Sequence, residues 1–430
     1  MSVDGLDIPA GGGADGRFVC VFNRSRDSYQ VPVALHEADL LQALVTDYYA
    51  PDRAPSWLPG FLRRKHHRQL PSERTVSDRT AFIVQYAGAV LRLPMERVFR
   101  WVDLRLGRTA AKVATQSGAH LYCYHHYLPE HVSNDTCLIV FVFHPLPSFY
   151  RQMLADDFAL YPEVETSFRL EDRSGLEPHI PFPWTRPDAI VCASKITAQS
   201  LIAAGAPEDR IAIIPYGLPE QRASSPPLPD QRPEDQPTRF LFVGNGVQRK
   251  GIHHLLRAWG ARARLGAELI IVSYELDPAI ARLASGDSSV RILGYQSRGE
   301  LDALFAGSDV FIMPSLLEGF GLVYLEALAA GCHVIATPNT GVPDLGLSVE
   351  AATLVEPGDL QAIDAAISAA IAHAAAVGFD RAAIAAEAGR WTQADFRQAI
   401  AAHAARTLAK FNDAATGPQP EGVEASAIIA

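Results

Sequence analysis

Short apolar runs separated by helix-length stretches of mixed polarity characterise the first half of the chain. The clearest runs are 137–143 (Cys-Leu-Ile-Val-Phe-Val-Phe), 188–193 (Asp-Ala-Ile-Val-Cys-Ala) and the shorter 18–22. A continuous apolar run of this length predicts a strand that is covered on both faces. The alternation of such strands with helices predicts a mostly parallel sheet.

A second series of strands and helices begins at Arg239. The alanine-rich segment 360–408 that follows it is expected to be helical. Two such series in tandem predict an α/β protein with two Rossmann-like doubly wound domains facing a central cleft. Sheets of this kind bind ligands at the carboxyl ends of their strands. The expected strands of the second series are 240–243, 268–272, 290–292, 310–313 and 333–336.

Composition marks the boundaries between the two units. Residues 219–237 are rich in proline and polar residues, which is typical of an interdomain linker. The polar, glycine-rich start and the tail lack the apolar content that a packed core needs. The expected layout is a flexible 1–16, an N-terminal domain 17–218, the linker, a second domain 238–389, a C-terminal helix 390–411 packing back on the first domain, and a disordered tail 412–430.

The composition of the 430 residues narrows the class of protein. The chain is 48% hydrophobic with a formal net charge of −10, so it is not expected to bind nucleic acid, which usually requires a basic domain. Five scattered cysteines without a C-x-x-C pair argue against a disulfide scaffold or a zinc site. No signal peptide or membrane-spanning run is evident, which predicts a cytoplasmic protein.

The strongest chemical signal lies between the expected strands 310–313 and 333–336. A tight loop there contains Gly319 and Gly321, and a helix is expected to begin at the second glycine. Free backbone N–H groups and the positive end of the helix dipole make such a helix start a natural anion site. Leu322, Leu325 and Leu328 of this helix are expected to face the core.

Two glutamates flank this helix start. Glu318 lies in the loop, where a carboxylate can bind sugar hydroxyls, and Glu326 lies more than one turn into the helix, within reach of a ribose diol. The alternative is one glutamate that caps a helix and another on its solvated face. The glycines, the strand context and the spacing together make that alternative the weaker interpretation.

The spacing of Glu318 and Glu326 resembles the E-x7-E motif of glycosyltransferase family four, whose members have the two-domain GT-B fold. The resemblance covers 240–355 and extends to 188–217, where Pro215-Tyr216-Gly217 stands in place of the family's P-N-G. It implies a nucleotide-diphosphate sugar on the second domain, with Glu318 at the sugar and Glu326 at the nucleotide. Further donor contacts would come from Gly319, Phe320, Gly321 and Leu322.

A glycine turn followed by two cations opens the second domain. Gly244 and Asn245 come first, and Arg249 and Lys250 follow directly before a helix. Cations beside glycine amides suit a diphosphate, whereas the alternative is a solvated loop with ordinary surface charges. By resemblance Lys250 clamps the donor phosphates. The family usually has arginine where Asn245 stands, and Arg249 is the residue that could compensate.

Two aromatic residues complete the predicted donor side. Tyr295 lies in a turn that resembles the family's turn near the nucleotide base, although an ordinary exposed aromatic is the alternative. His144 follows the run 137–143 at the carboxyl edge, and by resemblance it lies beside the donor sugar. The alternative is a histidine that caps a strand end. The predicted catalytic set is therefore Glu318, His144 and Lys250.

The acceptor side is less well marked. The family's glycine pair after the first strand is absent, and Arg24, Asp47 and His125 are the candidates, although each residue type is common without a function. In 57–68, apolar anchors stand beside a basic cluster, which suits an anionic membrane surface or a lipid-linked acceptor. A solvated loop over the first domain is the more common case for such a segment.

These features predict a hexosyltransferase that moves a sugar from a nucleotide-diphosphate sugar to a glycan, lipid-linked or small-molecule acceptor. The enzyme is expected in the cytoplasm, with peripheral contact at the inner membrane face. No D-x-D sequence occurs, so neither a metal nor a cofactor is expected, and by resemblance the transfer retains anomeric configuration. The alternatives are another GT-B enzyme, a sugar-nucleotide epimerase or a phosphorylase, and a non-catalytic nucleotide-sugar-binding relative.

Overall fold

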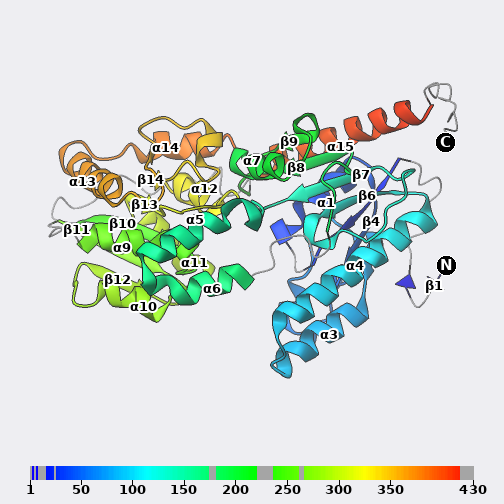
Figure 1. Cartoon of the computed structure of the whole chain (residues 1–430), viewed down its shortest axis with the longest axis horizontal. Helices are drawn as coiled ribbons and strands as arrows, with labels where there is room; N and C mark the ends of the chain where they lie inside the picture. The colour runs from blue at the N-terminus through cyan, green and yellow to red at the C-terminus, as the bar shows by residue number, and fades with distance from the viewer. Residues whose placement is uncertain are drawn as a thin grey trace, which may run out of the picture.

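The computed structural model describes residues 2–3, 6–7, 16–23, 26–173, 181–219, 236–260 and 266–416. Two helix-flanked parallel sheets, one from each half of the chain, lie side by side (Figure 1). The expected linker 219–237 falls almost entirely outside the described residues. So does most of 1–16, where two two-residue strands, β1 (Ser2–Val3) and β2 (Leu6–Asp7), pair antiparallel.

The N-terminal sheet has the strand order β5-β4-β3-β6-β7-β8-β9 and is parallel throughout. The apolar runs at 137–143 and 188–193 form β7 and β8, whose residues are all buried, as continuous apolar runs predict. β5 escaped prediction because three residues at a sheet edge carry too little pattern. The strands are β3 (Phe18–Val21), β4 (Leu41–Thr46), β5 (Thr75–Ser77), β6 (His120–Tyr124), β7 (Leu138–Val142), β8 (Ala189–Cys192) and β9 (Ile211–Ile213).

The C-terminal sheet has the order β12-β11-β10-β13-β14-β15 and is also parallel. The order reverses between β10 and β13, as it does between β3 and β6 in the other sheet, and ligands of doubly wound sheets bind outside such a reversal. The predicted GT-B arrangement of two Rossmann-like domains is confirmed. The strands are β10 (Thr238–Val243), β11 (Ala267–Val272), β12 (Val290–Leu293), β13 (Val310–Ile312), β14 (His333–Ala336) and β15 (Ala352–Leu354).

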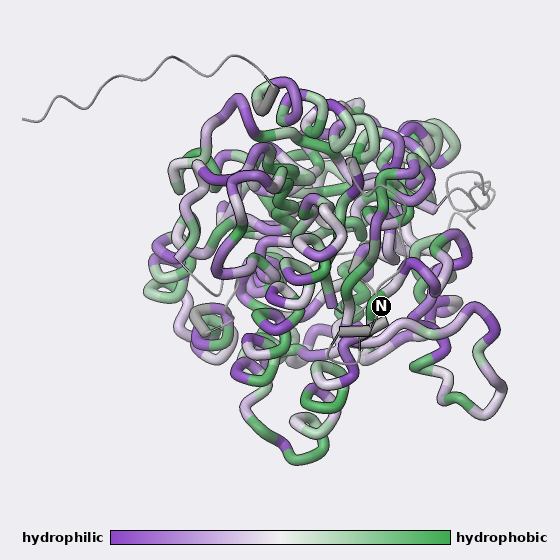
Figure 2. The backbone as a smooth tube through the Cα atoms, turned by 90° about the vertical axis from the view of Figure 1, so that its right-hand side faces the viewer, coloured by the Kyte–Doolittle hydropathy of each residue, from purple (hydrophilic) through white to green (hydrophobic). Residues whose placement is uncertain are grey.

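Helices cover both faces of the two sheets, and the apolar strands run through the interior (Figure 2). Those of the first half are α1 (Gln30–Glu37), α2 (Gly60–Arg63), α3 (Arg79–Val90), α4 (Met95–Ser117), α5 (Pro147–Leu160), α6 (Glu165–Arg173) and α7 (Lys195–Ala203). Those of the second half are α9 (Ile252–Gly260), α10 (Pro278–Ala281), α11 (Arg298–Ala306), α12 (Leu322–Ala329), α13 (Leu360–Ala376), α14 (Arg381–Ala388) and α15 (Gln393–Thr416).

Each half of the chain supplies helical segments that pack on the other half. α5 and α6 follow β7 but lie against the C-terminal domain (Figure 1), where Gln248 donates to the Asp157 carboxylate at 2.7 Å. In return, α15 packs on α1 of the N-terminal domain, and Arg397 bonds to Glu37 at 3.0 Å and to Gln30 at 2.9 Å. α15 continues to Thr416, past residue 412, where the sequence suggested that a disordered tail begins.

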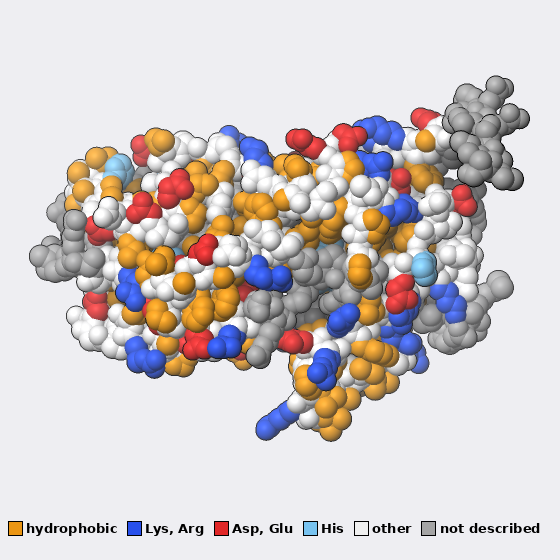
Figure 3. Space-filling model, in the orientation of Figure 1, with side chains coloured by type: hydrophobic (Ala, Val, Ile, Leu, Met, Phe, Trp, Pro, Cys, Tyr) orange, Lys and Arg blue, Asp and Glu red, His pale blue; other side chains and the backbone are white. Residues whose placement is uncertain are grey.

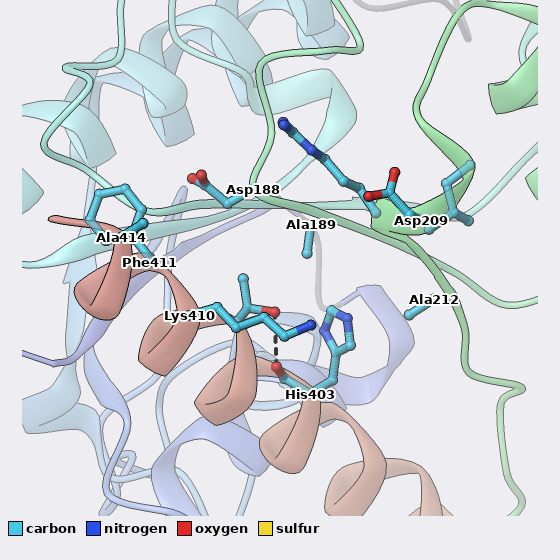
Figure 4. Close-up of a pocket in the computed structure, with 11 residues that line it drawn as sticks. Asp188, Ala189, Asp209, Ala212, His403, Lys410, Phe411 and Ala414 are labelled. Atoms are coloured by element: carbon cyan, nitrogen blue, oxygen red, sulfur yellow. Dashed lines mark hydrogen bonds between the residues drawn. The ribbon is translucent and has the colours of Figure 1, made fainter. Parts of the chain in front are cut away.

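A hollow of about 350 Å³ lies between α15 and the strands β8 and β9, of which β9 is the edge strand (Figure 4). His403 of α15 lines it, and the Lys410 ammonium points toward the histidine ring. Burial, together with the nearby Arg406 and Lys410 charges, lowers the pKa of His403 from 6.5 to about 4. The folded chain therefore resists a proton that the unfolded chain accepts.

This difference predicts a pH-dependent stability. Above pH 6.5 His403 is neutral in both the folded and the unfolded chain, so it does not affect the stability. As the pH falls from 6.5 toward about 4, the unfolded chain binds a proton that the folded chain does not, and the free energy of unfolding decreases. We expect the melting temperature of the wild type to fall more steeply over this interval than that of His403→Leu. The exposed His131→Gln serves as the control and should follow the wild type; equal slopes for all three proteins would contradict the assignment.

Candidate functional site

A cleft of about 580 Å³ lies between the two domains, at the carboxyl edges of both sheets. Its walls come from the loops after β3, β7, β9, β10 and β13 and from α6 and the start of α12. Both points of strand-order reversal therefore open onto the same space. The lining residues are Asp27, Phe143, Glu171, Tyr216, Val243, Gly244, Asn245, Val247, Arg249, Lys250, Glu318, Phe320, Gly321, Leu322, Val323 and Glu326.

The cations and the first carboxylate of the predicted donor site form one cluster. Lys250 contacts the Glu318 carboxylate directly, and the Arg249 guanidinium bonds to the same carboxylate at 3.2 Å. Glu171, which α6 brings across from the first half of the chain, accepts from Arg249 Nε at 3.2 Å. All four side chains are at most 15% exposed, so the cluster balances two buried positive charges with one carboxylate from each half of the chain.

Burial and the neighbouring Arg249 charge lower the pKa of Lys250 well below its usual value, and the Glu171 carboxylate opposes this shift. Two cations held this close repel each other, and each additional anion beside them favours the charged lysine. The cluster therefore favours an anionic ligand. Sequence reasoning missed Glu171 because α6 lies far from the motif in sequence and has no pattern of its own.

The start of α12 forms the second part of this wall. Gly321 precedes the helix with φ of 84°, a conformation in which a Cβ would also meet the Tyr324 ring at 2.6 Å. Leu325 and Leu328 are buried as expected. The expectation that Leu322 faces the core is wrong. Leu322 is the first residue of the helix, and its side chain lines the cleft.

Glu326 also lines the cleft. Burial raises the pKa of its carboxyl, and the Arg298 guanidinium, bonded to it at 3.0 and 3.1 Å, opposes the shift. Arg298 begins α11 and was not predicted, because nothing in its local sequence distinguishes it from a surface arginine. A partly buried carboxylate held by an arginine at the mouth of a cleft is suited to accept hydrogen bonds from a diol.

Gly319 joins the two domains by close backbone contact. A Cβ at this position would lie 2.2 Å from the Phe143 carbonyl oxygen and 3.1 Å from His144 Cα. The Ser194 and Thr197 hydroxyls donate to the Gly319 carbonyl from the start of α7. The loop that carries Glu318 is therefore fixed by the N-terminal domain, and the absence of a side chain allows that contact.

His144 lies beside the cleft but does not line it. Its Nδ1–H donates to the Pro145 carbonyl at 2.8 Å, and its buried Nε2 has no hydrogen-bond partner among the described residues. Burial and the Arg249 charge lower the pKa of His144 well below 6.5. The ring is neutral near neutral pH, and Nε2 is then an acceptor for a hydroxyl donor.

The N-terminal wall differs from the expected acceptor side. Asp27 lines the cleft, and its carboxylate accepts bonds from the Tyr124 hydroxyl at 2.9 Å and the Tyr216 hydroxyl at 3.1 Å. Three successive residues, Asp27 to Tyr29, have positive φ of 50°, 51° and 64°. Such conformations favour glycine, and they occur after the first strand, where the resembled family has its glycine pair.

The predicted acceptor residues are not at this wall. Asp47 is buried in a pair with Lys65, and His125 is buried against Phe143 and His126. Both follow strands of the N-terminal sheet, but neither side chain lines the cleft. Arg24 lies outside the described residues. Tyr295, predicted at the nucleotide base, is 76% exposed and does not line the cleft.

A buried trio lies away from the cleft lining, between α5 and α9. His253 and His254 contact the Asp157 carboxylate at 3.0 and 2.8 Å. Burial raises the pKa of Asp157, but the hydrogen bonds from the two histidines outweigh it and hold that pKa well below its usual value. The ligand atoms lie within 4.8 Å of one another, so the group could hold a metal ion. Sequence reasoning missed it because Asp157 and His253 are 96 residues apart.

The comparison with known proteins agrees with this geometry. The sequence model of the family described as Glycosyl transferases group 1 matches residues 237–373, the part of the chain that carries Lys250, Glu318 and Glu326. Sucrose-phosphate synthase from Thermosynechococcus elongatus has a similar structure, with a TM-score of 0.61 at 21% identity over 93% of this chain and 99% of that one. Residues 237–373 therefore resemble group 1 glycosyltransferases, and the two-domain structure has the GT-B fold.

Curated relatives match only part of this GT-B protein. The amylovoran biosynthesis glycosyltransferase AmsK of Erwinia amylovora is 27% identical over 184 residues, 40% of this chain and 44% of that protein. The O-antigen chain mannosyltransferase B of Escherichia coli is 32% identical over 135 residues, 30% of this chain and 35% of that protein. The chain thus spans less than half the length of these two relatives.

A second solved structure bears on the fold of the GT-B protein. HepE from Anabaena, in complex with UDP-glucose, has a TM-score of 0.52 at 16% identity, over 92% of this chain and 99% of that one. At this identity the likeness shows the shared two-domain architecture. Among the described residues, no helix is both long and apolar enough to cross a membrane.

The contact at Gly319 predicts a cost for any side chain there. We expect Gly319→Ala to destabilise the GT-B protein by about 1–3 kcal/mol, because the new methyl group meets the Phe143 carbonyl and the two domains must separate locally. Urea unfolding measures the change. Gly299→Ala in α11, where no atom lies within 4 Å of the added Cβ, is the matched control and should not lose stability. Equal stability of Gly319→Ala and wild type would contradict the tight contact.

Proposed function

We propose that this protein transfers a hexose from a nucleotide-diphosphate sugar to the hydroxyl of a glycan or lipid-linked acceptor, in polysaccharide or glycoconjugate biosynthesis. The observation that carries the proposal is the Arg249–Lys250–Glu318 cluster beside the start of α12, in a cleft between two Rossmann-like domains. HepE, a structural neighbour, is described in complex with UDP-glucose, and the matched curated relatives are named glycosyltransferases.

In this proposal Glu318 has two partners at different stages. Without ligand, its carboxylate neutralises Arg249 and Lys250. When the donor binds, the diphosphate takes over those cations with more charge and more acceptor atoms. Glu318 is then released to accept hydrogen bonds from the sugar hydroxyls, while Glu326 binds the ribose diol. Gly244 and Asn245 line the opposite side of the phosphates.

The chemistry requires a stabilised leaving group. The acceptor oxygen forms a bond to C1 of the sugar as the bond from C1 to the diphosphate oxygen breaks, and the electron pair leaves with the nucleoside diphosphate. The acceptor's proton goes to the departing phosphate oxygen. Lys250, Arg249 and the amides at the start of α12 stabilise the charge that develops there, with no metal or other cofactor in the proposal. Retention of anomeric configuration and a contact of His144 Nε2 with a sugar hydroxyl belong to the same proposal.

The acceptor is proposed to bind at the Asp27 wall. The Asp27 carboxylate lies across the cleft from the proposed donor cluster, and the hydroxyls of Tyr124 and Tyr216 orient it. A carboxylate held in this way accepts a hydroxyl hydrogen bond and fixes the direction of the attacking oxygen. This assignment replaces Asp47 and His125, whose side chains are buried elsewhere.

The protein is proposed to act in the cytoplasm, peripherally at the inner membrane face. Within 57–68, Trp57 is 79% and Phe61 50% exposed, and the exposed Arg63 and Arg64 stand beside them. Exposed aromatic rings next to arginines suit the interface of an anionic bilayer.

The donor cluster can be tested by calorimetry with UDP-glucose and GDP-mannose as probes. We expect Lys250→Ala to weaken the binding of whichever donor the wild type prefers by about 10-fold or more, because a charge-assisted hydrogen bond to phosphate is lost. Glu318→Gln should retain most of the binding but lose turnover. Lys410→Ala, an exposed lysine on α15, is the control. Full activity of both cluster variants would rule out the proposed donor site.

The acceptor wall has a separate test. We expect Asp27→Asn to lower transfer to a panel of oligosaccharide acceptors by about 10-fold or more while the donor dissociation constant stays within a factor of about two, because the carboxylate orients only the attacking hydroxyl. Tyr216→Phe, which loses one hydrogen bond to Asp27, should show the same effect more weakly. Loss of donor binding in Asp27→Asn would place this carboxylate on the donor instead.

A further inference from the structure

The hairpin of α3 and α4 carries an exposed surface that is both apolar and basic. Figure 3 shows hydrophobic side chains gathered beside arginine or lysine at the lower corner of the N-terminal domain, where α3 lies. We call the following ten residues the hairpin surface. Its apolar members, 44–67% exposed, are Ile83, Tyr86, Val90, Leu91, Leu93 and Trp101. Its exposed cations are Arg79, Arg92, Arg97 and Arg100.

The charge of this segment opposes that of the chain. Residues 79–101 contain four arginines and one glutamate, a net charge of +3, in a chain whose formal net charge is −10. Solvent-facing positions on a helix are normally polar, and a contiguous exposed apolar patch marks an interaction site. A surface that combines exposed apolar side chains with arginines is suited to a partner with an apolar interior and an anionic surface.

The apolar residues form a stripe on one side of α3. Ile83, Tyr86 and Val90 follow the helical spacing i, i+3, i+7, and Arg79 begins the same stripe. The opposite side packs tightly on α4, where a Cβ on Gly88 would lie 2.9 Å from Val98. Asp78 caps the start of α3 by accepting from the Ala81 amide. The hairpin is therefore a preformed ridge whose exposed stripe needs no rearrangement to bind.

The ridge projects from the edge of the sheet at which the cleft opens. α3 begins directly after β5, at the carboxyl edge, and α4 returns to the amino edge before β6. At 1.5 Å per residue the 23 residues of α4 span roughly 34 Å, about twice the roughly 17 Å of five-residue β6. The first half of α4 and the tip of the hairpin thus extend beyond the carboxyl edge, toward the acceptor side.

We propose that the hairpin surface docks on an anionic lipid bilayer and holds the acceptor side of the cleft at that surface. Ile83, Val90 and Leu91 insert among the lipids, and the arginines contact the headgroup phosphates. A second copy of this chain fits less well, because a twofold interface would set the same arginines against each other. The surface explains how a lipid-linked acceptor meets the cleft, and in that sense it rests on the proposed function, although the docking itself requires no donor.

Co-sedimentation with vesicles tests this without donor or acceptor. The full chain should bind vesicles of phosphatidylcholine mixed with phosphatidylglycerol, and added salt should weaken the binding. Vesicles of phosphatidylcholine alone should bind far less. Arg92→Gln and Arg97→Gln should each weaken binding about fivefold, the effect of one cation near an anionic surface. Arg291→Gln, an exposed arginine on β12 of the other domain, is the matched charge control and should bind like the wild type.

A double variant tests the apolar part. Val90→Ser with Leu91→Ser should reduce vesicle binding while leaving the melting temperature and the calorimetric donor affinity unchanged, because both side chains are exposed. The proposal is overturned if the wild type ignores anionic vesicles, or if only Trp57→Ser with Phe61→Ser abolishes binding. It is also overturned if the hairpin variants instead dissociate a dimer in solution. A wild type that turns over the donor but does not bind anionic vesicles would contradict the docking proposal alone and would leave the proposed function standing.

Discussion

The buried charge cluster of Arg249, Lys250, Glu318 and Glu171 is the interaction on which the cleft depends. Two cations at most 15% exposed are tolerated only when carboxylates compensate them, and these come from α6 and from the loop after β13. Because α6 belongs to the first half of the chain, the compensation ties the two halves together at the point where an anionic ligand would enter. The same charges therefore hold the two halves of the chain together and favour an anionic ligand in the cleft.

The remaining interdomain contacts hold this cluster in place. Gly319 lies against the backbone of Phe143, Gln248 bonds to Asp157, and Lys195 donates its amide hydrogen to Asp344 at 2.8 Å. A change of the angle between the domains would break the Gly319 contact and the Lys195–Asp344 bond together.

The C-terminal and N-terminal walls of the cleft differ in how far the sequence reveals their residues. Lys250, Glu318 and Glu326 could be located in advance because a glycine turn and a helix start require local spacing, and local spacing is visible in sequence. Asp27 could not, because its orientation depends on hydroxyls from Tyr124 and Tyr216, 97 and 189 residues away. Asp47 and His125 follow strands of the same sheet but do not line the cleft, because Asp47 pairs with Lys65 and His125 packs against His126 and Phe143.

The sequence by itself determined the two alternating series of buried strands and helices, and with them the doubly wound fold and the helix start at Gly321. These features depend on periodicity and on backbone geometry over a few residues. Only the tertiary structure decided that α6 supplies Glu171, that α11 supplies Arg298 to Glu326, and that the hairpin of α3 and α4 leaves an apolar, basic ridge uncovered. Such outcomes depend on which distant elements pack together, and packing between elements leaves no local pattern in the chain.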